Sequence, residues 1–263
     1  MKQQMFFALC ISLFFLSCSK NEKASNNSHG KVNIEPETNI GATGQINITN
    51  DGINYNYTTV RAKDGNIWLQ QNLGSKRVAQ FINDSMAFGH YFQWGRWIDG
   101  HQQYKPEPEV RNTNILFSNN PAGLPLGGIN FFIASWWNTG TNNDKWEASS
   151  PSEVTQFNGC DPCKALGNNW RLPTNEEWNE VVIAENITDA SSAYNSNLKI
   201  AYAGWRSSSS VFLNEVISSS RFWSSTASAT NTAFSLLINN NKVIKSFSDS
   251  RSYAMSIRCI QKM

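Results

Sequence analysis

Two stretches of the chain alternate apolar and polar residues with the period of two that is typical of β-strands. The first stretch, residues 53–73, contains the dipeptide Asp64-Gly65. Because Asp-Gly favours the tight turn of a β-hairpin, this stretch predicts two antiparallel strands that meet at the dipeptide.

The second alternating stretch lies near the C-terminus. Phe234, Leu236 and Ile238 form one set of alternating positions, and the polar run 239–242 separates them from a new apolar stretch that begins at Val243. The pattern predicts an antiparallel hairpin with one face on the core. We expect its other face, which is rich in Ser, Asn, Lys and Asp, to lie in water.

A helical period occurs between these two stretches. Trp178 and Val181 share one face of a helix that we expect from about residue 175 to residue 184. Thr174 precedes this helix, and Glu177 follows three residues later, which is the capping-box pattern of a helix start.

A shorter turn is expected just upstream of this helix. Asp161-Pro162 has the pattern of a helix cap followed by the first helical residue, and Gly167 would close a single turn. After Ser191 the pattern indicates strands and turns throughout.

Large aromatic rings are concentrated in residues 88–97, where five rings occur with two Gly. We interpret this density as core packing rather than as a platform for sugars. Residues 99–150 lack such a period and contain several Pro and Gly, so they predict long loops. Trp136, Trp137 and Trp146 lie in these loops, and the insertion around them is an alternative contact region.

The N-terminus has the pattern of an export signal. Lys2 precedes an apolar run that ends at Leu16, and this run is too short to span a bilayer. We therefore expect a signal peptide over residues 1–17. The cut before Cys18 resembles the bacterial lipoprotein box, which implies acyl chains such as palmitate on Cys18 and a stable membrane anchor. Residues 18–45 are mostly polar and predict a flexible tether.

The composition excludes one class of partner and favours a location. The net charge is +2 and charged residues make up only 16% of the chain, so we expect no nucleic-acid partner. Ten Trp among many Asn and Ser are typical of a protein outside the cytoplasm.

Three cysteines remain in the expected mature domain: Cys160, Cys163 and Cys259. Export favours a disulfide, and three thiols allow one bridge with one thiol left over. A bridge from Cys259 to either Cys160 or Cys163 would tie the middle of the domain to its end. A zinc site is disfavoured because it lacks a fourth ligand and the three His do not have zinc-finger spacing.

Five segments occur in the same order as in the Fibrobacter succinogenes major paralogous domain family, which the chain resembles. They are residues 51–73, 161–178, 203–216, 222–226 and 256–259. The resemblance implies an α+β, C-type-lectin-like fold over residues 46–263, with antiparallel hairpins, one or two short helices, long loops and an insertion at about residues 99–160. It also implies a Cys163–Cys259 disulfide. The chain departs from the family at residues 164–170, where the family has a shorter Pro-Ser/Thr-Gly-Trp link.

Related C-type-lectin-like proteins include receptors varied by retroelements, which present residues near the C-terminus to their ligands. The matching positions here are candidates for an exposed binding face: Asn231, Ser235, Leu237, Asn239, Lys245, Phe247, Asp249, Arg251 and Tyr253. The alternative is that Asn and Ser are simply common on exposed strands and turns.

Neither cofactor nor catalytic group is expected. The Glu-Pro-Asn or Gln-Pro-Asp and Trp-Asn-Asp motifs of calcium-dependent lectins are missing, so we expect no calcium at that site. Formylglycine-generating enzymes share this broad fold but need a Cys pair near the C-terminus, where this chain has only Cys259. We therefore expect a non-enzymatic protein.

These observations together predict a lipid-anchored protein of the cell envelope, held at the outer membrane and facing outward. It would bind a glycan or a protein through the exposed face of its C-terminal hairpin. The alternatives are a passive part of an envelope or fimbrial assembly and, less favoured, a relative of the formylglycine-generating enzymes.

Overall fold

A computed structural model describes residues 32–50, 53–103, 120–123, 136–208 and 212–261. The expected signal peptide at residues 1–17 and the lipidation site Cys18 lie outside the described residues. No helix in the described part of the chain is long and apolar enough to cross a membrane.

The first alternating stretch forms the hairpin that its pattern predicts. Strand β3 (Ile53–Arg61) pairs antiparallel with β4 (Ile67–Leu69), and the turn between them contains Asp64 and Gly65. Gly65 adopts a φ of 84°, a left-handed conformation that Gly enters without steric cost. Asp64 also accepts a hydrogen bond of 3.0 Å from the Trp68 ring nitrogen.

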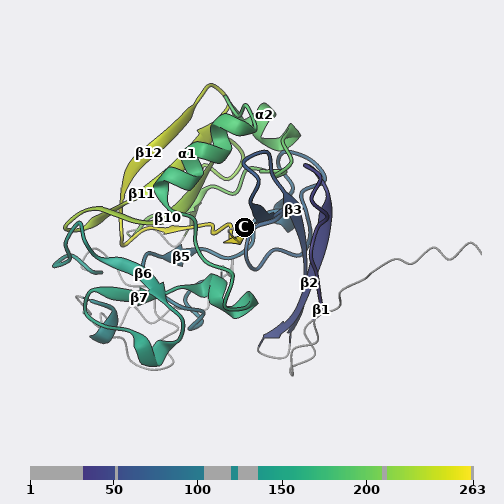
Figure 1. Ribbon diagram of the computed structural model, residues 1–263. Helices are drawn as coiled ribbons and strands as arrows, with labels where there is room; N and C mark the ends of the chain where they lie inside the picture. The colour runs from purple at the N-terminus through teal and green to yellow at the C-terminus, as the bar shows by residue number, and fades with distance from the viewer. Residues whose placement is uncertain (1–31, 51–52, 104–119, 124–135, 209–211, 262–263) are drawn as a thin grey trace, which may run out of the picture.

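These strands belong to a five-stranded sheet with the order β1-β2-β3-β4-β14. Its other members are β1 (Val32–Ile34), β2 (Thr43–Asn50) and β14 (Ile260–Gln261). Strand β14 therefore lies in the same sheet as the strands at the start of the domain. Figure 1 shows strands β1 to β3 along one side of the molecule.

The prediction of a flexible tether over residues 18–45 is wrong from Val32 onward. Strand β1 pairs with β2 over three residues, and the backbone carbonyls of Pro36 and Glu37 accept hydrogen bonds from the Arg61 guanidinium. The segment contributes little apolar surface of its own, but it is ordered because a neighbouring strand and a buried arginine supply its hydrogen-bond partners.

The predicted helix is confirmed as α1 (Asn175–Ala184), and its capping box is complete. Thr174 accepts from the Glu177 backbone at 3.2 Å, and the Glu177 carboxylate accepts from the Thr174 backbone at 2.9 Å. The Arg171 guanidinium forms a two-pronged ion pair with the same carboxylate, at 2.7 and 2.5 Å. The expected short turn upstream is also confirmed, as a 3-10 helix over Pro162–Leu166 that Asp161 caps.

A second helix, α2 (Ala190–Asn195), lies where the pattern indicated only strands and turns. Asp189 and Ser192 form a capping box around its first turn. The helix has six residues and too few apolar positions to show a period, which is why the pattern missed it.

The second alternating stretch forms a three-stranded antiparallel sheet with the order β10-β11-β12. Its strands are β10 (Ser219–Ala229), β11 (Thr232–Asn239) and β12 (Val243–Ser250), and the predicted turn at residues 239–242 is confirmed. Helix α1 lies against this sheet (Figure 1). Trp178 and Val181 of α1 pack with Phe222, Leu236 and Ile238 of the sheet in one core cluster.

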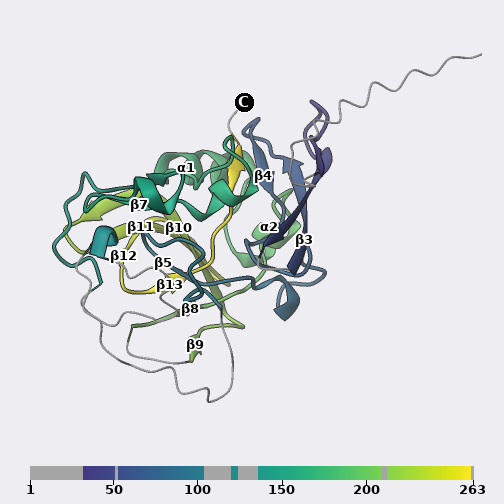
Figure 2. The same cartoon turned by 90° about the horizontal axis from the view of Figure 1, so that it is seen from below.

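Short strands complete the domain. A four-stranded sheet has the order β5 (Phe92–Gln93), β13 (Ala254–Met255), β8 (Trp205–Arg206) and β9 (Leu213–Asn214), and β6 (Lys145–Ala148) pairs in parallel with β7 (Asn158–Cys160). Figure 2 shows β5, β13, β8 and β9 side by side beneath the three-stranded sheet. The remaining 3-10 helices are Ser85–Ala87, Pro121–Gly123 and Pro151–Glu153.

The expected insertion at residues 99–160 contributes to the core where it is described. Trp136, Trp137 and Trp146 are at most 1% exposed, and Trp94 from the ring-rich stretch lies 4.9 Å from Trp137 between ring centroids. A side chain on Gly95 would lie 2.2 Å from the Trp137 ring, so only glycine fits there. These three rings therefore pack in the core, whereas residues 104–119 and 124–135 of the alternative contact region lie outside the described residues.

The implied Cys163–Cys259 disulfide is present and joins residues 96 positions apart. In the chain-entropy description, closing a loop of this length contributes about 4–5 kcal/mol to stability. Cys160 is free and buried, and burial raises the pKa of its thiol to about 12. At its coarser level the fold prediction is confirmed, because the described chain is mixed α+β with mostly antiparallel strands and two helices.

Candidate binding surface

Four of the nine predicted binding residues are buried, which corrects the prediction of an exposed hairpin face. Ser235, Leu237, Asp249 and Arg251 are 1%, 7%, 3% and 0% exposed, respectively. Strand β11 is the central strand of its sheet, and both of its faces are covered. Helix α1 packs on the face of Leu236, while on the opposite face Ala233 joins the Trp-rich core cluster.

Arg251 holds the core together and does not face a ligand. Its guanidinium pairs with the buried carboxylate of Asp144 and donates to the carbonyls of Thr141 and Ala229 at 2.7 and 2.9 Å. It also lies against two adjacent rings, 4.5 Å from the centroid of Trp94 and 4.9 Å from that of Trp137. Because the guanidinium is paired and fully enclosed, it has no N–H group that can donate to a ligand in solvent.

The other five predicted residues remain exposed or half-buried, but they do not form one patch. Asn231 lies in the turn between β10 and β11, and Asn239 lies at the opposite end of the hairpin. The Asn239 side chain accepts from the backbone of the following turn, so it shapes that turn. Lys245 is exposed on β12. Phe247 and Tyr253 are half-buried and belong to a cluster of side chains that the sequence did not reveal.

That cluster is the Arg221 cluster, which we define as Trp205, Glu215, Arg221, Phe247 and Tyr253. The guanidinium carbon of Arg221 lies 4.4 Å from the Trp205 ring centroid and 5.2 Å from the Phe247 centroid. The Tyr253 ring packs on Trp205 with centroids 4.8 Å apart. Glu215 accepts from the Trp205 ring nitrogen at 3.2 Å and lies 3.8 Å from Arg221.

Two carboxylates hold Arg221 in place. Its Nη1 donates to Asp249 at 2.6 Å, and Ser235 donates to the other oxygen of Asp249, also at 2.6 Å. Burial raises the pKa of Asp249, while the adjacent guanidinium of Arg221 opposes that rise. The buried side chains of Ser235 and Asp249 therefore fix the position of the Arg221 guanidinium.

The chemistry of the Arg221 cluster is that of non-covalent recognition. The chain's own Arg221 guanidinium already occupies the position of a cation over the rings of Trp205 and Phe247. The half-buried rings and the Glu215 carboxylate, 45% exposed in its side chain, remain for a ligand at the rim. Aromatic surface next to a charged group suits the apolar face of a sugar or a side chain of a protein partner.

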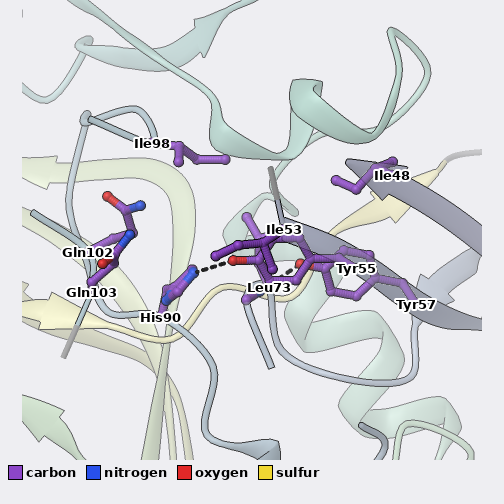
Figure 3. Close-up of a pocket in the computed structure, with 10 residues that line it drawn as sticks. Ile48, Ile53, Tyr55, Tyr57, Leu73, His90, Ile98, Gln102 and Gln103 are labelled. Carbon is purple, nitrogen blue, oxygen red and sulfur yellow. Dashed lines mark hydrogen bonds between the residues drawn. The ribbon is translucent and has the colours of Figure 1, made fainter. Parts of the chain in front are cut away.

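A separate small pocket lies between β2, β3 and the segment around His90 (Figure 3). Tyr55 and Tyr57 stack on one of its sides, and the Tyr55 hydroxyl lies 3.4 Å from His90 Nε2. Burial lowers the pKa of His90 to about 4, so this imidazole is neutral at pH 7. The cavity volume is about 20 Å³, enough for a water-sized group but far below the ~300–1,000 Å³ of ordinary ligand sites.

The described residues contain no group of three or more His, Cys, Asp or Glu that could hold a metal ion. Trp205 and Arg221 were recognised in the sequence only as members of strands. Their stacking could not be read from the sequence, because β8 and β10 meet through tertiary packing.

Comparison with protein-family models, curated proteins and solved structures finds no match to this chain.

Proposed function

We propose that this chain is a non-enzymatic binding protein of C-type-lectin-like fold, related to the Fibrobacter succinogenes major paralogous domain family. It is anchored by lipid on Cys18 to the outer membrane, faces outward, and recognises a glycan or a protein. The binding surface is the rim of the Arg221 cluster, together with the adjoining exposed residue Lys245 of β12.

The observation that carries this proposal is the arrangement of half-buried rings on a rigid base. Phe247 and Tyr253 come from different segments, yet each packs on a neighbour that ion pairs and hydrogen bonds immobilise. A preformed aromatic surface loses little conformational entropy on binding, which favours affinity. The order of the sequence motifs and the disulfide between the expected cysteines support the family assignment.

The test uses glycan arrays and pull-downs with the full-length chain in mild detergent. The double variant Phe247→Ala/Tyr253→Ala should weaken binding at least tenfold, because it removes both accessible rings of the predicted set. Lys245→Glu changes an exposed side chain without touching the core, and it should weaken binding of the same ligand severalfold. The matched control is Phe157→Ala, which removes a ring that is 53% exposed outside the cluster.

Binding that is retained by both hairpin variants would refute the proposed surface. A chain that binds neither glycans nor proteins, but co-purifies with an envelope assembly, would favour the passive structural role instead. The enzyme alternative would regain support if turnover were observed. The buried thiol of Cys160 and the disulfide-bonded Cys259 do not offer the reactive pair that the formylglycine chemistry requires.

A further inference from the structure

A second, larger depression lies between strands β2 and β3 and the segment 76–80, on the face of the strands opposite to Ile46 and Tyr57. Its volume is about 400 Å³, within the range of sites that hold a sugar or a drug-sized ligand. Seven polar residues line most of it: Gln45, Asn56, Thr58, Gln71, Lys76, Arg77 and Gln80. We call this depression the polar groove.

The floor of the polar groove presents amide and hydroxyl groups on a rigid backbone. Gln45 lies directly opposite Thr58 in the β2–β3 register, and Asn56 is the next residue of β3 on the same face. The buried side chain of Gln71 extends the sheet, because it accepts from the Thr58 backbone at 3.2 Å and donates to the Asn56 carbonyl at 3.4 Å. The backbone of the floor is therefore fixed before any ligand arrives.

The wall of the polar groove is equally well fixed, and Asp84 organises it. The Arg77 guanidinium forms two bonds to the buried Asp84 carboxylate, at 2.9 and 3.0 Å, and the Gln80 backbone donates to the same group at 3.0 Å. The Tyr194 hydroxyl donates to the Gln80 carbonyl at 2.6 Å. These bonds fix the shape of the wall and tie it to α2.

The groove carries two cationic side chains, and only one of them has an anionic partner among the described residues. Asp84 neutralises Arg77, whereas the exposed side chain of Lys76 makes no hydrogen bond or ion pair with the described residues. The lining residues include no aromatic ring and only two apolar side chains, Val78 and Ala79. A protein partner would need a buried apolar anchor, which this lining does not offer.

We propose that the polar groove is a binding site for an acidic saccharide, distinct from the Arg221 cluster. The amides of Gln45 and Asn56 supply donors and acceptors for sugar hydroxyls, and the Lys76 ammonium pairs with a uronate carboxylate of the ligand. Because the groove is open and preformed, an oligosaccharide enters it without rearrangement of the chain.

Isothermal titration of the full-length chain with two tetramers tests this site: α-1,4-linked galacturonate and the neutral α-1,4-linked glucose tetramer. We expect the galacturonate tetramer to bind at least fivefold more tightly in low salt, with the preference shrinking as salt rises. Lys76→Gln should remove that preference, and Gln45→Ala/Asn56→Ala should weaken binding of both tetramers. Lys145→Gln, with the same loss of charge at an exposed site away from the groove, is the matched control.

Equal binding of the two tetramers, or binding that neither groove variant changes, would overturn the proposal, as would a chain that binds neither tetramer. The variant Phe247→Ala/Tyr253→Ala separates this site from the Arg221 cluster. Galacturonate binding that survives this variant supports the groove, and loss of binding would assign the saccharide to the cluster and reject the groove. Thermal melts of all variants check that the exposed substitutions leave the fold intact.

Discussion

The N-terminal sheet and the C-terminal sheet arise from the same kind of alternating sequence, yet they bury different faces. In β2 and β3 one face packs inward with Ile46 and Tyr57, while the other exposes Gln45 and Asn56. In β11 both faces are buried, including the side chain of Ser235. Alternation therefore predicts which residues share a face, but it does not predict whether another segment covers that face.

The largest expected effect concerns Arg251, which we first expected on a wet face. Arg251→Met should destabilise the fold by about 3–5 kcal/mol, because it leaves the buried Asp144 carboxylate without its partner. Lys245→Met on the exposed strand β12 should change stability by less than about 0.5 kcal/mol. Urea unfolding of both variants checks this difference. Similar effects at the two positions would mean that Arg251 lies on the surface after all.

The segment of residues 90–101 should be more sensitive to acid than β11. Burial lowers the pKa of both His90 and His101 to about 4, from 6.5 in the unfolded chain. His101 faces Asp99, which attracts its proton, and Arg96, which repels it, and burial is the largest cause of its shift. Because the unfolded state binds more protons between pH 6.5 and 4, stability is lost as pH falls through that range.

Each histidine would account for on the order of 3 kcal/mol of that loss. Hydrogen exchange at pH 7 and pH 4.5, corrected for the intrinsic pH dependence of amide exchange, should show a larger loss of protection around His90 and His101 than in β11. His101→Gln should reduce the slope of stability against pH. An unchanged slope in this variant would assign the acid sensitivity to other groups.

A smaller effect compares matched truncations in the two sheets. Leu237→Ala in β11 should cost about 2–4 kcal/mol, because it leaves a cavity in a strand that is covered on both sides. Ile53→Ala at the start of β3 removes a side chain that is half exposed and should cost less than about 1 kcal/mol. Thermal unfolding measures both, and equal costs would contradict the difference in coverage described above.

Several features were predictable because their hydrogen bonds close within a few residues. The capping box of Thr174 and Glu177 and the turn at Gly65 each depend on neighbours along the chain. The disulfide between Cys163 and Cys259 was predictable only through the family resemblance, since three thiols left two pairings with Cys259 open.

The sequence alone determined helix α1, the turns at Gly65 and at residues 239–242, and the positions that share a strand face. Only the tertiary structure decided that helix α1 and the Trp-rich cluster cover opposite faces of β11, and that Trp205 reaches Arg221. It also decided that Lys76 faces the amides of Gln45 and Asn56 across one groove. Exposure and recognition depend on segments that are distant in sequence and meet only when the chain folds, whereas a cap or a turn is complete within its own few residues.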